Sequence, residues 1–573
     1  MKELLKAAMK AEPCDLLLTG ARVANVFTLE YEDVDIAVKN GVIVGLGHGY
    51  EAEEVVDCSG GVLVPGFIEG HMHIESTFMV PRNLAAAISP LGTTTIMPDP
   101  HEIANTCGME GIRFMKRESQ GLPVDMYFGA PSCVPASAYE TPFEPLSAAD
   151  MTRLFDEGTC THLGEMMNFP GVFLGDGDTW AKLEAAHGRV ITGHAPGVTE
   201  ETLAGYILGG ATSDHECSCE AEAMEKLRRG MYVMIRQGAT ARNLETLAPI
   251  VREDKFLSCR CMAVSDDISP DFMHERGHLD GCIRELIASG VEPLAALRMV
   301  TLSPAEYFRL DDRGALAPRR IADIVLVDSL ENCRVLKVWK RGRLVAEDGV
   351  LKQKITPSVV STLPGIAGKV TTPAPESLKV AMPSADAKMY VIGVIPGQVA
   401  TKTLLLEPTT ADGFAVADAA RDIAKFAVVE KNRGTGRTAV GFLKDFGLTR
   451  GAVASSIAHD AHNFSCAGMD DISMAAALKE LASMGGGIVV ADGEKILARL
   501  ELPVGGLMSL LPLDELRARI KPLSEARDAL GCTNSHAFMQ LAFLSLSVIP
   551  ELKLTDQGYC DIIAGAMPLF AER

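Results

Sequence analysis

The sequence lacks the features that mark several classes of protein. Aromatic residues make up only 5% of its 573 residues, and 54 Lys and Arg are outnumbered by 75 Asp and Glu. The net charge of -21 argues against charge-driven binding to nucleic acid or to anionic membranes. No apolar run reaches the roughly 20 residues that span a bilayer. Lys10 and Glu12 interrupt any apolar start that would act as a secretion signal.

The cysteines also lack the regular spacing of a disulfide framework, although there are fourteen of them. In a chain of this length such cysteines are typical of reduced thiols, so we expect a cytoplasmic protein. We expect neither a nucleic-acid partner nor a membrane partner. The length predicts about three or four domains at roughly 150 residues each.

Two clusters of short predicted strands flank a long middle segment of the chain. The first cluster lies within residues 14–64 and contains Asn40-Gly41, a dipeptide typical of a tight hairpin turn. The second cluster lies within residues 322–345. We therefore expect residues 1–64 and 306–351 to form one small β-sandwich domain that the middle segment interrupts.

In the middle segment, residues 65–305, short apolar runs alternate with helical stretches, which is the pattern of parallel β/α architecture. Eight such runs predict a (β/α)8 TIM barrel, whose active site would lie at the C-terminal ends of its strands. The predicted strands are residues 62–68, 93–97, 124–128, 160–163, 189–192, 211–213, 231–235 and 259–264.

The remaining chain divides by composition into two parts. Residues 352–385 are rich in Pro, Ser and Thr, so we expect them to be a linker. Residues 386–573 contain further strand-like runs at 391–395 and 487–490, which indicate a C-terminal α/β domain. The expected fold class is α/β throughout the barrel and the C-terminal domain.

Polar or ionisable residues follow directly after most of the predicted barrel strands. His71 and His73 come first; because they are one residue apart on a strand, their rings should point to the same side. Since parallel strands of a barrel end at one face, we expect the whole set to meet there. The set is His71, His73, Asp99, His101, Glu102, Glu165, His194, His215, Glu216, Asp266 and Asp267.

Four imidazoles and two carboxylates in this set are enough to hold two divalent metal ions. The predicted ligands are His71, His73, Glu165, His194, His215 and Asp266. Glu165 would bridge the ions, with a hydroxide shared between them, because metals lower the pKa of bound water and polarise the group under attack. Asp266, beside the metals, would take the proton and return it.

Longer strings around these residues resemble the amidohydrolase superfamily and, within it, the bacterial adenine deaminases. The similarity covers essentially the whole chain and includes both the barrel and the C-terminal segment. The strings are GHMHIES at 70–76, DPHEIAN at 99–105, AHDAHN at 458–463 and PVGGLMS at 503–509.

The resemblance implies a purine-metabolising enzyme that deaminates adenine to hypoxanthine and ammonia, by attack of the shared hydroxide on C6. It implies manganese or iron as the metal, with zinc as a further option, and a homo-oligomer, either a dimer or a tetramer. Many amidohydrolases carry a carboxylated lysine on strand four. Residues 160–168 contain no lysine, and Glu165 stands in that place, as in the adenine deaminases.

Several assignments stay open at the level of sequence. Candidates for handling protons at the purine edge are His101, Glu102, Glu216 and His278, and the sequence does not rank them. Either Asp266 or Asp267 could face the metals, and we favour Asp266 because it comes first after the apolar run. A cluster of His459, Asp460 and His462 is either a further metal site or part of the active-site wall.

Two other functions compete with deamination. The first is hydrolysis of a cyclic amide, as in dihydroorotase-like or hydantoinase-like enzymes, which the missing strand-four lysine and the long C-terminal segment disfavour. The second is a non-catalytic scaffold, which the complete set of predicted ligands disfavours.

Overall fold

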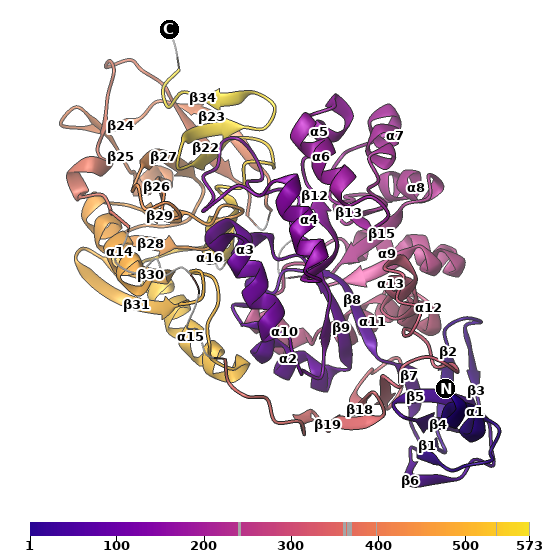
Figure 1. Cartoon of the computed structure of the whole chain (residues 1–573). Helices are drawn as coiled ribbons and strands as arrows, with labels where there is room; N and C mark the ends of the chain where they lie inside the picture. Colours follow the sequence, from indigo (N-terminus) through magenta and orange to yellow (C-terminus); the bar gives the residue numbers. More distant parts are fainter. Residues whose placement is uncertain (239–241, 359–362, 364–369, 397, 535, 572–573) are drawn as a thin grey trace.

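The computed structural model describes residues 1–573 except 239–241, 359–362, 364–369, 397, 535 and 572–573. The barrel lies between a small β-domain, which contains the N-terminus, and the C-terminal domain (Figure 1). Within the described ranges, no helix is both long enough and apolar enough to cross a bilayer.

The small β-domain is a sandwich of two sheets assembled from both sides of the barrel. Leu16 and Val38 of one sheet share a core with Leu63 and Trp339 of the other. The first sheet consists of β5 (Val42–Leu46), β4 (Ile36–Lys39), β1 (Cys14–Thr19) and β6 (Ala52–Asp57). The second consists of β20 (Val350–Leu351), β19 (Arg343–Glu347), β18 (Val335–Lys340), β17 (Ile324–Val327), β7 (Val62–Pro65), β2 (Arg22–Asn25) and β3 (Glu30–Glu32). Helix α1 (Lys2–Ala8) packs beside the first sheet.

Eight parallel strand positions form the predicted barrel. Isolated parallel bridges join Ile191 to Ala211 and Met72 to Asp266, and the second of these closes the ring. The third strand is interrupted at Tyr127, so two short pieces share that position. The strands are β8 (Phe67–Met72), β9 (Thr93–Pro98), β10 (Asp125–Met126) with β11 (Phe128–Ala130), β12 (Cys160–Met166), β13 (Ile191–Gly193), β14 (Ser213–Asp214), β15 (Tyr232–Arg236) and β16 (Cys261–Val264).

Helices surround the barrel with their apolar sides against the strands. In α9 the buried residues Leu244, Leu247, Ala248 and Val251 follow the three- and four-residue spacing of one helix face. The main helices are α2 (Pro81–Ile88), α3 (His101–Glu118), α4 (Ala148–Asp156), α6 (Gly177–Ala185), α7 (Glu200–Leu208), α8 (Glu220–Arg228), α9 (Leu244–Glu253) and α11 (Leu279–Ala288). Shorter ones are α5 (Phe169–Leu174), α10 (Pro270–Arg276), α12 (Pro293–Met299), α13 (Leu302–Tyr307), η1 (Glu75–Thr77), η2 (Ser89–Leu91) and η3 (Lys255–Cys259).

The first and last predicted barrel strands need correction. Residues 62–68 are not one strand, because the chain leaves the sandwich and enters the barrel at Gly66. The Gly66 amide donates to Asp323 of the β-domain at 2.9 Å, and a Cβ there would lie 2.3 Å from Thr94 Oγ1. The eighth strand begins at Cys261 because the preceding residues form η3. The second strand matches its prediction closely.

The C-terminal domain is built on a mixed sheet of eight strands. They are, in order, β23 (Thr401–Leu406), β22 (Met389–Val394), β27 (Thr438–Lys444), β26 (Ile423–Val429), β29 (Phe464–Gly468), β28 (Ala452–Ser455), β30 (Gly487–Asp492) and β31 (Lys495–Glu501). Its helices are α14 (Asp471–Met484), α15 (Leu513–Ala529), α16 (Ala537–Phe543) and η5 (Ala419–Arg421). Two small sheets comprise β21 (Val380–Ala381), β25 (Phe414–Val416) and β24 (Thr409–Ala411), and β32 (Lys553–Thr555), β33 (Gly558–Asp561) and β34 (Gly565–Met567).

The predicted linker, residues 352–385, is shorter in the structure. Its last part forms η4 (Pro375–Leu378) and β21, and the side chain of Leu378 is buried in the C-terminal domain. The Pro-rich composition predicts a linker, but a proline is also favoured in the first turn of a helix, and η4 begins with Pro375. Composition alone therefore does not separate these elements from a linker.

The loop after the third barrel strand joins the barrel to the C-terminal domain. Glu140 on this loop accepts hydrogen bonds from the amides of Ala461, at 3.0 Å, and Ser547, at 3.3 Å. The carbonyl of the next residue, Thr141, accepts one from Asn432 at 3.1 Å. Through these contacts the C-terminal domain is held over the end of the barrel at which the strands terminate.

Candidate active site

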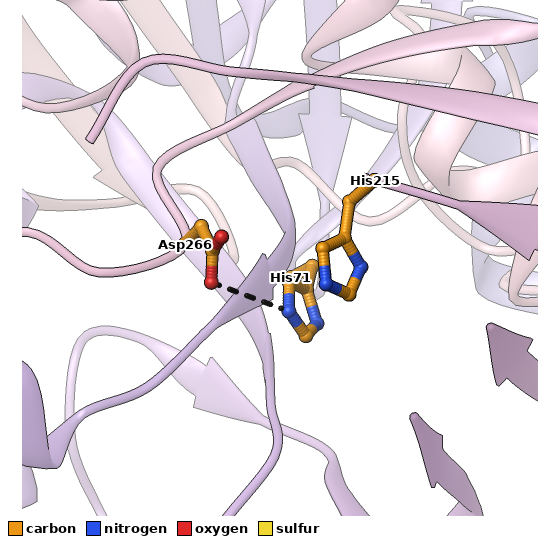
Figure 2. A group of neighbouring side chains, drawn as sticks. All are labelled: His71, His215 and Asp266. Atoms are coloured by element: carbon orange, nitrogen blue, oxygen red, sulfur yellow. Dashed lines mark ion pairs between the residues drawn. The ribbon is translucent and has the colours of Figure 1, made fainter. Parts of the chain in front are cut away.

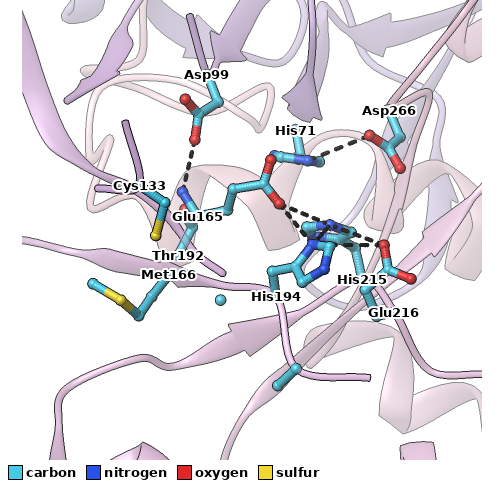
Figure 3. Close-up of polar contacts among 12 residues, drawn as sticks. His71, Asp99, Cys133, Glu165, Met166, Thr192, His194, His215, Glu216 and Asp266 are labelled. Carbon is cyan, nitrogen blue, oxygen red and sulfur yellow. Dashed lines mark hydrogen bonds and ion pairs between the residues drawn. The ribbon is translucent and has the colours of Figure 1, made fainter. Parts of the chain in front are cut away.

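The six predicted metal ligands converge at the C-terminal ends of the barrel strands, and Figure 3 shows all of them except His73. All six side chains are buried, and the most accessible, His194, is 8% exposed. Glu165 lies within β12 rather than after it, because that strand continues to Met166. The six are His71, His73, Glu165, His194, His215 and Asp266.

Glu165 lies between two pairs of histidines. Its Oε1 is 3.4 Å from Nε2 of His73. Its Oε2 is 2.9 Å from Nδ1 of His194 and 3.2 Å from Nε2 of His215. The Glu165 amide donates to Asp99 Oδ2 at 2.7 Å, which fixes the backbone beneath the carboxylate. Each oxygen therefore faces a different set of nitrogens, the arrangement expected of a bridging ligand.

Asp266 is the carboxylate that faces His71, in β8, and His73, directly after it. Its Oδ1 lies 3.5 Å from Nε2 of His71 (Figure 2). The same oxygen lies 3.2 Å from Nε2 of His73. Its backbone is left-handed, with φ 53°, where the chain turns after β16, and its amide donates to His71 O at 3.1 Å. Asp267 also lines the cavity but bonds through Oδ1 to the hydroxyl of Ser76. Of the two aspartates, Asp266 has the closer contacts with the predicted ligands.

Charged neighbours keep Asp266 ionised. Although burial opposes ionisation, the neighbouring imidazoles of His71 and His73 and the charge of Arg236 hold the Asp266 pKa well below its ordinary value. Arg236 Nη1 donates to Asp266 Oδ2 at 2.9 Å, and its Nη2 donates to Glu216 Oε2 at 3.0 Å. The guanidinium thus holds two carboxylates at the edge of the site.

The histidine nitrogens are arranged as metal ligands would be. His73 Nδ1 lies 3.2 Å from the carbonyl of Asp99, so a proton on Nδ1 leaves the lone pair of Nε2 facing Glu165 and Asp266. The buried Nε2 atoms of His71 and His194 have no hydrogen-bond partner. Buried polar atoms without partners are costly, and divalent metals suit such imidazole and carboxylate donors. The residues present therefore fit a metal centre.

The predicted acid–base candidates divide into two groups. His101 and Glu216 line the same cavity as the ligands, and His101 Nδ1 is 3.6 Å from Glu165 Oε1. Glu102 does not line it; its Oε2 is 3.1 Å from Nε2 of His462. His278 is a core residue hydrogen-bonded to Thr93, and burial lowers its pKa to about 3. The suggestion that His278 handles the substrate edge is therefore wrong.

The C-terminal domain supplies part of the cavity wall. His459 and Asp460 line the cavity, which favours the second of their two predicted roles, although Glu102, His459 and His462 also lie close enough together to be considered as a metal site. The amide of Ala458 donates to His462 Nδ1 at 3.2 Å. The neutral ring of His462 therefore carries its proton on Nε2 and offers Glu102 a donor rather than a lone pair. The apolar wall consists of Met167, Val399, Phe543, Leu546, Val548 and Ile549.

Two buried charged residues were missed from the sequence. Arg236 is the last residue of β15, so the same rule that selected the other strand ends would have found it. Glu69 lies inside β8 and accepts hydrogen bonds from the amides of His71, at 3.1 Å, and Ser265, at 3.0 Å. Glu69 thus fixes the ends of the two strands, β8 and β16, that precede or contain predicted ligands. An acidic residue inside an apolar run gives no indication from the sequence that it holds two strand ends together. Burial raises the pKa of Glu69 to about 8.

Comparison with known proteins gives consistent matches along the whole chain. The amidohydrolase family model matches residues 62–345, and the model of the adenine deaminase C-terminal domain matches residues 398–565. An adenine deaminase of Oleidesulfovibrio alaskensis is 44% identical over 98% of this chain and 97% of its own length. Adenine deaminases of Cereibacter sphaeroides and Desulfatibacillum aliphaticivorans are 43% and 41% identical, over 96% and 98% of both chains. With this identity along nearly its entire length, and with both family domains present, the chain belongs to the adenine deaminase family of amidohydrolases.

Proposed function

We propose that this protein catalyses the hydrolytic deamination of adenine to hypoxanthine and ammonia. The observation that carries the proposal is the convergence of five buried side chains around Glu165, whose two oxygens face different histidines. The proposed substrate, adenine, comes from the relatives, which are named adenine deaminases and match this chain over nearly their full length. Glu165 in place of a strand-four lysine disfavours the alternative of cyclic amide hydrolysis, and the complete donor set disfavours a scaffold.

We propose that two divalent metal ions share this site. His71, His73 and Asp266 would hold one ion, His194 and His215 would hold the other, and Glu165 would bridge them. When bound, the metals lower the pKa of water and polarise the group under attack. Imidazole and carboxylate donors suit manganese or iron, which we propose as the native metal, with zinc as the alternative.

Asp266 is the proposed proton shuttle. An ionised carboxylate accepts a proton, and Asp266 is held in that form by its histidine and arginine neighbours. It would take the proton of the attacking water and deliver it to the exocyclic amine, which leaves as ammonia. Attack at C6 also places negative charge on the ring unless N1 is protonated. His101 and Glu216 line the cavity, so these two are the proposed groups at that edge.

The apolar wall would hold the faces of the purine. Phe543, Val548 and Ile549 bring aromatic and aliphatic surface to the cavity from the C-terminal domain. A planar base stacks on such surface while its polar edge meets the charged groups of the barrel. The C-terminal domain is thus proposed as a part of the active site.

We further propose that the enzyme is a cytoplasmic homo-oligomer, either a dimer or a tetramer.

Ammonia release tests this function directly. The metal-reconstituted protein is assayed with a panel of purines, and hydrolysis of dihydroorotate is assayed in parallel. Release of ammonia from adenine with no hydrolysis of dihydroorotate supports deamination. Ring opening of dihydroorotate without ammonia release from adenine would favour the alternative, and no reaction with any compound would favour a scaffold.

A further inference from the structure

A second cavity, of about 350 Å³, lies between the barrel and the C-terminal domain. Its walls come mainly from α10 on the barrel and from α15 and α16 on the C-terminal domain. Helices α10 and α15 contact each other, and Figure 1 shows them on the two sides of the junction between the domains. An ion pair of 2.9 Å between Asp271 and Arg517 joins α10 to α15 beside it. The apolar lining of this chamber includes Phe78, Phe272, Ile457, Leu523, Phe538 and Met539.

The chamber has the chemistry of a site for a flat heterocycle. Aromatic rings from both domains line the chamber, and two of these rings each have a guanidinium over them. The guanidinium of Arg242 is 4.6 Å from the ring centre of Phe272, and that of Arg527 is 5.6 Å from the ring centre of Phe538. A purine base offers two apolar faces to such rings and a polar edge to hydroxyl groups. Ser455 and Ser524 supply hydroxyl groups in the lining.

The chamber adjoins the catalytic cavity. His459 lines both spaces. Ser76 lines the chamber, and its hydroxyl bonds to Asp267, which lines the catalytic cavity. The two spaces therefore meet at the imidazole of His459 and at this one polar pair. The predicted metal ligands are almost completely buried and lie at the bottom of the catalytic cavity, next to this second space.

Among the described residues, the ring of His459 is held by ring contacts, with Phe543 and edge-on with His462 at 5.0 Å, and not by a side-chain hydrogen bond. It lies parallel to Phe543, with ring centres 4.7 Å apart and an interplanar angle of 7°. Its Nδ1 is 3.8 Å from Oδ1 of Asp460, which is too long for a hydrogen bond. A rotation of the ring would therefore cost its packing on Phe543 and His462 but no hydrogen bond to Asp460, and a purine base could stack on Phe543 in its place.

We propose that the chamber is an entry site that binds a purine base before it reaches the catalytic cavity, with His459 as the movable partition. This proposal rests on the proposed function for the identity of the ligand. It adds a binding site outside the metal centre and assigns the gap between the domains as the route of substrate entry.

The test is to fill the chamber without touching the metal centre. Ser524 on α15 lines the chamber and is half-buried, so Ser524→Trp places an indole within it. The control is Glu525→Trp, at the next position on the same helix, where the side chain is 66% exposed. Met539→Trp enters the chamber from α16 and replaces Ser524→Trp if that variant binds less metal than the parent.

If the chamber is the entry site, Ser524→Trp lowers kcat/KM for adenine about tenfold, while the single-turnover rate at saturating adenine stays within about twofold of the parent. Glu525→Trp keeps both parameters. A Ser524→Trp protein with its full metal content and an unchanged kcat/KM would overturn the proposal that the chamber is an entry site. A Ser524→Trp protein in which the single-turnover rate falls by the same factor as kcat/KM would also overturn it. A parent that releases no ammonia from adenine overturns the proposed function instead, so the two failures are distinguishable.

Discussion

Arg236 donates a hydrogen bond of 2.9 Å to the Asp266 oxygen that does not face the histidines. The other oxygen of Asp266 lies 3.2 Å from His73, so the carboxylate is fixed from both sides. This contact keeps Asp266 ionised and aimed into the site, which are the two properties that a proton acceptor needs. Because Arg236 also holds Glu216, one guanidinium orders two of the proposed acid–base groups.

Asp266→Asn should fold and keep much of its metal, because the amide is nearly isosteric with the carboxylate. Turnover should fall on the order of 10² to 10⁴, since an amide does not accept the proton of the attacking water. Steady-state ammonia release measures this loss. Asp267→Asn is the matched control and should lose less than about tenfold, because Asp267 bonds to Ser76. An inactive Asp267→Asn protein beside an active Asp266→Asn protein would reverse the assignment.

Arg236→Gln should raise the pKa of Asp266, because it removes the cation that helps to hold that pKa down. The acidic limb of the kcat/KM profile, where the base becomes protonated, should therefore move to higher pH. Hydrogen bonds to charged groups contribute about 1.5–3 kcal/mol, so kcat/KM at neutral pH should fall about 10- to 100-fold. Arg236→Lys, which keeps the charge, should shift the limb less. An unmoved limb in Arg236→Gln would show that Asp266 does not set it.

Activity should not depend on bicarbonate. The Glu165 carboxylate is permanent, whereas the carbamate of a modified lysine must form from dissolved carbon dioxide. Chelator-treated protein reconstituted in degassed buffer, with and without added bicarbonate, should recover the same activity. Glu165→Gln serves as the control and should retain less metal under both conditions, since its amide is a weaker bridge. Recovery only in the presence of bicarbonate would contradict the role given to Glu165.

Lys553→Met should loosen the apolar wall. Lys553 is fully buried, and its Nζ donates to the carbonyls of Val399, at 2.6 Å, and Phe543, at 3.1 Å, both of which line the cavity. We expect KM for adenine to rise about three- to tenfold with a smaller change in kcat, because the lysine acts through wall residues. Lys521→Met, at a side chain that is 79% exposed, should change neither. A fall in kcat alone would contradict a positioning role.

The same variant should alter the pH dependence of stability. Burial lowers the pKa of Lys553 to about 7, whereas an unfolded lysine titrates at about 10.4. Between those values the unfolded chain binds more protons, so this residue makes stability rise with pH across that window. The Tm of the parent minus that of Lys553→Met should therefore be larger at pH 9 than at pH 7. An equal difference at both pH values would mean that Lys553 does not titrate in this range.

The barrel and the convergence of the six candidate ligands could be predicted from the sequence because both follow from local patterns. Each candidate ligand stands at or near the end of an apolar run, and parallel strands end at one face. The apolar content of residues 62–68 predicts one strand, but it does not indicate which sheet a strand joins, and Gly66 divides these residues between two sheets. The sequence also does not show that His278 lies in the core, away from the cavity, so it predicts a catalytic role that the structure does not support.

The wall of the site was beyond prediction for a different reason. Val399 and Phe543 are 144 positions apart, and each lies far along the chain from the barrel residues that they face. Apolar residues of this kind resemble ordinary core until the tertiary structure brings the two domains together. Only the polar string around His459 and Asp460 gave a local signal, and its role as wall or as metal site was left open.

Metal titration tests the central claim most directly. Chelator-treated protein is titrated with Mn²⁺ while ammonia release from adenine is followed, with bound metal measured at each step. If Glu165 bridges two ions, activity rises to a break at about two equivalents per chain, and His71→Ala loses bound metal together with turnover. Full activity at one equivalent or without metal, or a His71→Ala protein with two tightly bound ions and normal turnover, would contradict the account.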